Sequence, residues 1–143
     1  MADYYPPLAF HFKVTFNNVE GETAFQSVDG LTVELETEQV AEGGENRFKH
    51  VLPVRSKYPH LVLKRGLITN SDLIKWCREA LEDMVIEPTD ITISLLNEKH
   101  EPLMTWNVAH AYPVKWSVSN FNAEESKLVI ETIELTYNYF KLQ

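Results

Sequence analysis

Cysteine is almost missing from this sequence, and membrane-spanning and signal-peptide segments are missing as well. Cys77 is the one cysteine among 143 residues, which excludes a disulfide within the chain and fits a reducing compartment. No apolar run approaches the roughly 20 residues that span a bilayer, so we expect no membrane insertion by this chain. The first residues lack the basic and apolar segments of a secretory signal. We therefore expect a single domain over residues 1–143, synthesised in the cytoplasm.

Positive charge is also scarce. The chain has 13 Lys and Arg residues against 21 Asp and Glu residues, a formal net charge of −8. Binding to nucleic acid irrespective of sequence depends on Lys and Arg that neutralise phosphates, and only Lys64-Arg65 forms a short basic cluster. The acids are spread along the chain, which indicates a folded acidic surface rather than an acidic tail. We predict no stable binding of nucleic acid.

Familiar catalytic and cofactor motifs are missing as well. Gly43-Gly44 lacks the Lys-Ser or Lys-Thr that completes a phosphate loop, and no serine lies in a Gly-x-Ser-x-Gly elbow. Cys77 falls on the apolar face of a predicted helix, where a thiol lacks the electropositive setting that makes it reactive. The histidines show no metal-binding spacing: His11, His50, His60, His100 and His110. We predict no catalytic residue, no metal ligand and no cofactor site.

Alternating apolar and polar residues are what the chain does contain, and this period of two predicts β-strands. The predicted strands are 10–16, 23–28, 31–40, 60–65, 91–95, 104–108, 114–119 and 127–140. One helix is predicted after Ser71 as N-cap, ending before Pro88. Its apolar residues at helical spacing are Leu73, Ile74, Cys77, Ala80, Leu81 and Met84. This pattern predicts a mainly β protein with one α-helix, folded as an antiparallel barrel or sandwich.

Residues 25–44 contain a turn signal and a row of acids. Asp29-Gly30 predicts a hairpin or a corner between two strands. Beyond it, Glu34, Glu36 and Glu38 occupy alternate positions and therefore share one face of a strand. An exposed row offers no environment that separates the pKa values of two carboxyls, which disfavours a glycosidase-like acid and base pair. Two interpretations remain: a solvated face, or the lining of an assembled surface.

The segment 41–59 is predicted to be a long loop, because it contains two adjacent glycines, two prolines and scattered basic residues. Loops longer than about 12 to 15 residues within a compact domain usually bind something. Phe48, Val51 and Leu52 also make this segment too apolar for an idle linker.

Aromatic residues gather at both ends of the chain, namely Tyr4, Tyr5, Tyr137, Tyr139 and Phe140. The predicted last strand is longer than usual, which suggests a sheet that continues into another subunit. The aromatic ends either contact neighbouring subunits or fold back on their own domain.

The order and spacing of these motifs resemble the inner tail-tube proteins of contractile phages and of phage-tail-like contractile injection systems. One departure is Val54, because many relatives have glycine after the proline of Leu52-Pro53. The matching residues are Phe10, Phe12, Val14, Phe25, Val28-Asp29-Gly30-Leu31, Glu42-Gly43-Gly44, Asn46, Leu52-Pro53, Leu63-Lys64-Arg65-Gly66, Trp76, 93–98, Pro102, Trp106, 111–115 and 130–135.

The resemblance implies a homo-hexameric ring, stacked into a hollow tube inside a contractile sheath, with no catalytic activity and no cofactor. It implies sheath and baseplate partners, cargo in the lumen, and assembly into a phage tail or tail-like particle, including particles released from the cell. The acidic face of Glu34, Glu36 and Glu38 would line the lumen or, with the opposite assignment of strand faces, point outward toward the sheath. The chain ends would contact other subunits. The loop residues that would contact an adjacent ring or subunit are Gly43, Gly44, Asn46, Phe48 and Leu52.

Two alternatives stay open. A tube-initiating, baseplate-proximal or terminator protein would share the fold and form single rings. A small β-barrel that binds a ligand or acts as an enzyme belongs to another class, and predicts a closed polar pocket in the isolated monomer.

Overall fold

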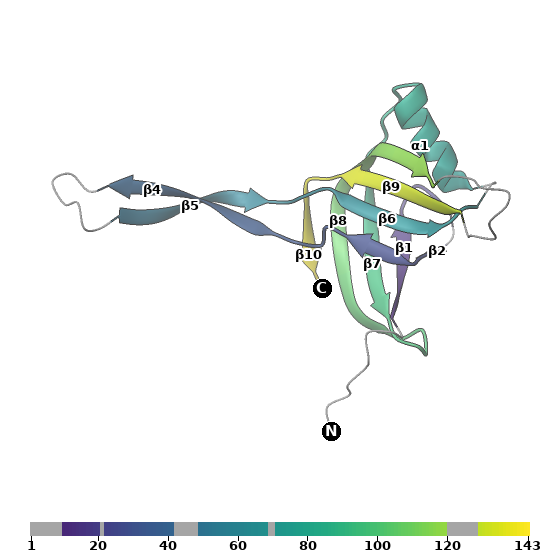
Figure 1. Cartoon of the computed structure of the whole chain (residues 1–143), viewed down its shortest axis with the longest axis horizontal. Helices are drawn as coiled ribbons and strands as arrows, with labels where there is room; N and C mark the ends of the chain where they lie inside the picture. Colours follow the sequence, from purple (N-terminus) through teal and green to yellow (C-terminus); the bar gives the residue numbers. More distant parts are fainter. Residues whose placement is uncertain (1–9, 21, 42–48, 69–70, 120–128) are drawn as a thin grey trace.

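Two parts make up the protein: a body of antiparallel strands flanked by one helix, and a long two-stranded ribbon that projects from it (Figure 1). The computed structural model describes residues 10–20, 22–41, 49–68, 71–119 and 129–143. Its elements are β1 (His11–Phe16), β2 (Glu22–Phe25), β3 (Ser27–Asp29), β4 (Glu34–Ala41), β5 (Lys49–Lys57), β6 (Leu61–Gly66), α1 (Asp72–Glu82), β7 (Thr89–Leu96), β8 (Pro102–Val118), β9 (Ile130–Thr136) and β10 (Tyr139–Leu142). The predicted mainly β fold with one helix is confirmed.

The body is an eight-stranded sheet with the order β2-β1-β7-β8-β9-β6-β3, and β10 also pairs with β8. The strands at the two ends of this order, β2 and β3, are separated in the chain by Gln26 alone. One residue cannot bridge the two edges of an open sheet of this width, so the sheet curls back on itself as a barrel. The predicted strand 23–28 is therefore two strands, with Gln26 donating its backbone N–H to the Lys64 carbonyl at 2.9 Å.

The interior is filled by the alternate apolar residues of the strands and by one face of the helix. Val14 and Phe16 of β1, Ile91 and Ile93 of β7, and Val108 of β8 are all at most 2% exposed. The period-two pattern thus predicted these inward residues, but Met104, which alternates in step with Val108, is 42% exposed.

β8 differs from the sequence prediction. Strands 104–108 and 114–119 were expected, yet one strand runs through Pro102–Val118. Its first half pairs with β7 and β10 and its second half with β9, because the strand bends at His110 (φ 60°) and shifts register between Pro113 and Lys115. A bulge of this kind increases the local bend and lets one strand turn a barrel corner.

The predicted last strand, 127–140, is also wrong as one element. Residues 127 and 128 lie outside the described part of the chain. β9 ends at Thr136, and after a short break β10 continues along the same edge of β8, with Tyr139 opposite Ala109. The C-terminal segment therefore returns to its own sheet.

Helix α1 begins as predicted. Ser71 is the N-cap, and its hydroxyl accepts a hydrogen bond from the Leu73 N–H at 3.1 Å. The buried face consists of Leu73, Trp76, Cys77 and Ala80. Met84 was expected on this face, but the helix ends at Glu82 and Met84 is 75% exposed. Within the described ranges, no helix is long and apolar enough to cross a membrane.

Candidate assembly interface

The ribbon occupies most of the segment that was expected to be a loop. The prediction for 41–59 is wrong over Lys49–Lys57, which forms β5 and pairs antiparallel with β4 from Glu34 to Ala41. Pro53 favoured a loop in the prediction, because proline cannot donate a backbone hydrogen bond to a strand on either side. Each strand of a two-stranded ribbon has one unpaired edge, however, and proline is tolerated there. The register shifts opposite Glu36 and Thr37, which leaves Val54 as the bulged residue.

The acidic row of β4 faces basic residues of β5. Glu34 lies opposite Lys57, and Glu36 lies opposite Arg55 with Oε2 to Nε at 2.6 Å. The hydrogen bond and charge of Glu36 raise the pKa of Arg55 above its ordinary value. Because this ion pair is solvent-exposed, it contributes little to stability. Glu34, Glu36 and Glu38 thus share a ribbon face with cations, and their lining role stays a prediction.

The ribbon also carries exposed apolar side chains. We call them the ribbon patch: Val33 (51% exposed), Leu35 (59%), Val51 (58%), Leu52 (49%) and Val54 (56%). The strand register places Leu35 and Val51 on one face of the ribbon and Leu52, opposite Glu38, on the other. Exposed apolar residues of this kind commonly mark protein–protein contacts. Of the predicted assembly-loop residues, Leu52 belongs to this patch, and Gly43, Gly44, Asn46 and Phe48 lie outside the described residues.

The two legs of the ribbon approach each other closely where they leave the body. Gly30 has φ +99°, and a Cβ placed on it would lie 2.2 Å from the His60 carbonyl oxygen. Only glycine allows this approach. Asp29-Gly30 therefore forms the corner that the sequence predicted as one of two options, and β3 and β4 do not pair as a hairpin.

An aromatic cluster lies at the base of the ribbon, where the ribbon joins the body. The Tyr58 ring lies 5.9 Å from the Tyr137 ring and 5.2 Å from the Phe140 ring. Tyr58 follows β5, so the cluster joins the ribbon to the C-terminal segment. Burial, and then the neighbouring Tyr58, raises the pKa of Tyr137 to about 12. The Tyr137 hydroxyl is buried and has no hydrogen-bond partner among the described residues.

These contacts place part of the aromatic C-terminus against its own domain. Tyr139 remains 44% exposed, with the Lys141 Nζ 5.7 Å from its ring centroid. Tyr4 and Tyr5 lie outside the described residues. The inter-subunit role of Tyr137, Tyr139 and Phe140 stays a prediction.

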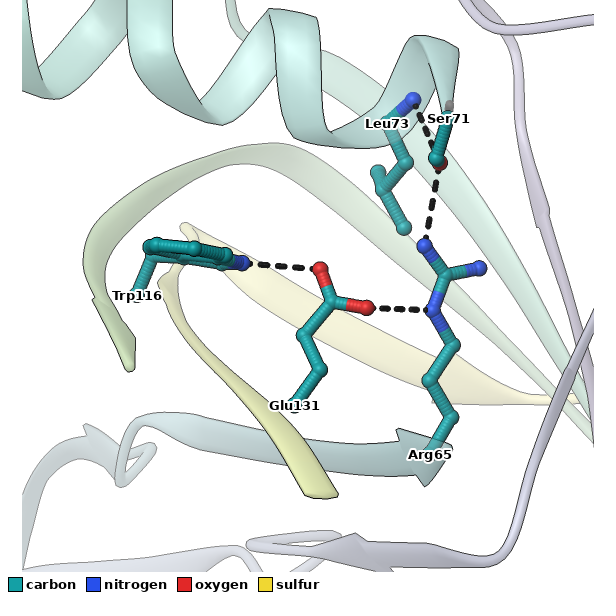
Figure 2. Close-up of polar contacts among 5 residues, drawn as sticks. All are labelled: Arg65, Ser71, Leu73, Trp116 and Glu131. Carbon is teal, nitrogen blue, oxygen red and sulfur yellow. Dashed lines mark hydrogen bonds and ion pairs between the residues drawn. The ribbon is translucent and has the colours of Figure 1, made fainter. Parts of the chain in front are cut away.

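A buried polar network ties helix α1 to the barrel (Figure 2). The Arg65 Nε donates to the Glu131 Oε2 at 2.8 Å, and these side chains are 3% and 0% exposed. The Trp116 indole N–H donates to the other Glu131 oxygen at 2.7 Å. Arg65 also donates to the Ser71 hydroxyl at 3.0 Å, which is the cap of α1. The network therefore joins β6, β8 and β9 to the start of the helix.

The sequence reading missed this network, although a signal was present. Arg65 has the same parity as Leu61 and Leu63 in β6, and Glu131 has the same parity as Ile133 in β9. A charged residue that alternates in step with the apolar residues of a strand points into the core, where it needs a partner of opposite charge. Of the two residues of the short basic cluster, Arg65 is buried and Lys64 is exposed.

Cys77 is a core residue, as predicted, and it lies near this network. Desolvation raises the pKa of its thiol to about 12, with Glu131 raising it further and Arg65 opposing. The thiol is protonated at neutral pH and is not exposed to solvent. It is therefore a poor nucleophile.

Histidine contacts were not visible in the sequence spacing. His11 Nε2 and His100 Nδ1 lie 2.9 Å apart, although the residues are 89 positions apart. Over the described ranges, no group of three or more His, Cys, Asp or Glu side chains is placed to hold a metal ion.

A second exposed apolar group follows helix α1. We call it the helix-end patch: Leu81 (39% exposed), Met84 (75%), Val85 (47%) and Ile86 (46%). Met84 has φ 58°, in the left-handed region, and the Val85 N–H donates to the Glu79 carbonyl at 3.0 Å. The Trp76 indole N–H donates to the Glu87 carbonyl at 2.9 Å, which ties the segment after the helix to α1 itself.

Comparison with known proteins agrees with this architecture. The family model described as "T4-like virus tail tube protein gp19" matches residues 8–141. A chain of the anti-feeding prophage (AFP) baseplate structure, 6-fold symmetrised, is 31% identical over 100% of this chain and 97% of its own, with a TM-score of 0.83. No curated protein sequence matches significantly.

Two further structures extend the comparison. A chain of the sheath-tube complex of an extracellular contractile injection system, PVC, in the extended state is 28% identical over 96% of this chain and 90% of its own, with a TM-score of 0.78. Hcp1 from Flavobacterium johnsoniae is 13% identical over 92% of this chain and 94% of its own, with a TM-score of 0.55, and shares the fold.

Proposed function

Given that this chain belongs to the T4-like virus tail tube protein gp19 family, we propose that six copies form a ring and that these rings stack into the hollow inner tube of a contractile tail-like particle. The match across residues 8–141 is the observation that carries this function. The six-fold symmetry stated for the similar AFP baseplate supports the number of subunits.

The ribbon is the element best suited to hold such a tube together. It projects from the body (Figure 1). It also carries exposed apolar side chains. A stable assembly usually buries more than about 1,000 Å² at each interface, and a projecting arm adds contact area beyond the barrel wall. The proposed assembly contacts are made by Leu52, which the structure describes, and by four residues of the segment that connects β4 and β5: Gly43, Gly44, Asn46 and Phe48.

Sheath and baseplate proteins are the proposed partners, because similar chains occur in a sheath-tube complex and in a baseplate. Cargo passes through the lumen, and the role is structural rather than catalytic. The protein is synthesised in the cytoplasm and joins a tail-like particle, which is released from the cell in systems of the extracellular kind.

The lining role of Glu34, Glu36 and Glu38 also belongs to this proposal. Negative charge in a passage repels acidic cargo and keeps it from adhering. Glu34→Lys with Glu36→Lys should therefore increase cargo retention and salt sensitivity while leaving the melting temperature nearly unchanged. A large loss of thermal stability with unchanged retention contradicts this role.

A terminator or initiator is the second candidate. A chain of the anti-feeding prophage cap is 26% identical with a TM-score of 0.81, and one of the PVC terminator is 28% identical with the same score. Sedimentation velocity separates the candidates. A tube protomer forms species that lengthen with concentration, a terminator stops at single rings, and a monomer at every concentration contradicts both.

A further inference from the structure

Two histidines that are distant in the sequence meet at one end of the barrel. His11 begins β1, and His100 lies in the turn that joins β7 to β8 (Figure 1). Pairing of His11 with Leu96, the last residue of β7, brings the start of β1 beside this turn. The two rings meet edge to face with centroids 4.8 Å apart, and the His11 Nε2 lies 2.9 Å from the His100 Nδ1. The proposed tube function makes no use of this pair.

The turn that carries His100 is fixed by hydrogen bonds. Asn97 is 1% exposed, and its Oδ1 accepts from the backbone N–H groups of Lys99 at 2.9 Å and Glu101 at 3.0 Å. The His100 N–H donates to the Asn97 carbonyl at 3.0 Å, and the Asn97 N–H donates to the Glu101 carbonyl at 3.0 Å. The backbone of His100 is therefore held in place by its own turn, as a ligand-binding residue needs to be.

The backbone conformation of His100 is a second, independent observation. Its φ of 62° lies in the left-handed region, where glycine is the usual residue and other residues are uncommon. Glycine would fit this turn without strain, but it would supply no side chain opposite His11. Residues held in uncommon backbone conformations are concentrated at functional sites.

Two imidazole nitrogens at this separation suit a single metal ion. Zinc binds histidine nitrogens at about 2.0 to 2.1 Å, so two such nitrogens around one ion lie roughly 3.0 to 3.4 Å apart. The observed 2.9 Å is close to this range. An ion lies off the line that joins the two nitrogens, so both rings must turn from their present hydrogen bond to bind it. His100 is exposed and His11 is half-buried, so the pair can be reached from solvent.

The nitrogens, rather than local charge, determine which ion fits. The charged residues next to the pair in the sequence are balanced in sign: Lys13, Glu98, Lys99 and Glu101. Among the described residues, no third His, Cys, Asp or Glu side chain completes a ligand set, so water fills the remaining positions around a bound ion. Imidazole suits zinc, nickel and copper, whereas magnesium prefers oxygen ligands.

We propose that His11 and His100 form a binding site for one divalent transition-metal ion that prefers nitrogen ligands, with zinc as the representative ion. The bound ion replaces the hydrogen bond between the rings and ties the start of β1 to the turn between β7 and β8. This site departs from the prediction of no metal ligand, which rested on the spacing of histidines along the chain, because its two ligands are 89 positions apart.

Isothermal titration calorimetry of the untagged full chain with zinc chloride tests the site. We expect one ion per chain, and no binding heat with magnesium chloride at the same concentrations. His11→Ala and His100→Asn should each weaken zinc binding by more than about tenfold, because even groups that only orient a metal ligand contribute about 10- to 100-fold. Asparagine is chosen at position 100 because it tolerates the left-handed conformation.

The matched control is His60→Ala, which removes a histidine whose Nδ1 lies 3.7 Å from the Glu134 carboxylate instead of beside a second ring. This variant should bind zinc as the unmodified chain does. Three results overturn the site: no zinc binding by the unmodified chain, equal affinity in the His11 and His100 variants, or loss of binding in His60→Ala instead.

Thermal unfolding supplies a second measurement that does not depend on ring or tube formation. An ion that binds only the folded chain raises its melting temperature as the ion concentration increases. Zinc should therefore raise the melting temperature of the unmodified chain and of His60→Ala, but not that of His100→Asn. An equal rise in all three chains contradicts binding at this pair.

Discussion

Arg65 and Glu131 show what a single buried charge demands of its neighbours. Both side chains are nearly inaccessible, the second Glu131 oxygen accepts a hydrogen bond from Trp116, and Arg65 Nη2 donates to the helix cap Ser71. Such a pair adds little net stability over an apolar pair, but one charge without the other is costly. The pair therefore positions α1 on the barrel more than it strengthens the fold.

Arg65→Met should lower the free energy of unfolding by about 3 to 5 kcal/mol, because it leaves the Glu131 carboxylate buried without its cation. Urea denaturation monitored by tryptophan fluorescence measures this change. The matched control is Lys64→Met, the exposed neighbour on β6, which should stay within about 0.5 kcal/mol of the unmodified chain. Equal effects of the two substitutions contradict the network, as does failure of Arg65→Met with Glu131→Met to recover part of the loss.

Tyr137→Phe should stabilise the protomer by about 1 kcal/mol, because it removes a buried hydroxyl that has no partner among the described residues. Tyr139→Phe, at an exposed ring, is the control and should change nothing. The pKa of Tyr137 rises from 10.0 to about 12, so the unfolded chain loses this proton first. Its contribution is full below pH 10 and is lost as the pH rises toward 12. Tyr137→Phe should therefore weaken the alkaline decline of the melting temperature, and an unchanged decline contradicts this assignment.

Several residues could be assigned from the sequence because their signals are local. Ser71 precedes a helical pattern, and Cys77 lies on the apolar face of that helix, so cap and core positions were predictable. Arg65 and Glu131 are 66 positions apart, and their pairing depends on the register of β6 against β9. The sequence showed only that each of the two residues occupies an inward-pointing position of its strand.

The ribbon is the element that differs most from its sequence prediction. Glycines and Pro53 indicated a loop, while the pairing of β5 with β4 depends on a register that local propensity does not specify. β8 was divided in the prediction because local propensity does not indicate that one strand continues through a bend at His110 and through Pro113. Strands with regular alternation and no proline, such as β1 and β7, were predicted closely.

Gly30→Ala tests whether the base of the ribbon is fixed. A Cβ at this position meets the His60 carbonyl at 2.2 Å, and φ +99° is itself unfavourable for alanine. The free energy of unfolding should fall by more than about 1 kcal/mol, and amides of β4 and β5 should exchange faster with deuterium. Asp29→Ala, at the exposed preceding residue, should have little effect. Comparable losses for both variants contradict a specific role for Gly30.

At the scale of the whole molecule, the barrel and the ribbon are expected to be separable. β4 and β5 form a sheet of their own, apart from the eight-stranded sheet. Replacing residues 37–54 with Asn-Gly, which favours a tight hairpin between the paired residues Glu36 and Arg55, should leave the melting temperature of the protomer nearly unchanged and abolish tube growth. Circular dichroism and sedimentation velocity measure the two effects. Normal tubes from the shortened chain contradict the assembly role of the ribbon.

Negative-stain electron microscopy of the purified full chain, across a range of concentrations and with sheath and baseplate partners supplied, tests the tube function most directly. The family match and the projecting ribbon predict six-membered rings that stack into hollow tubes of uniform width. Particles that remain monomeric under all of these conditions contradict it.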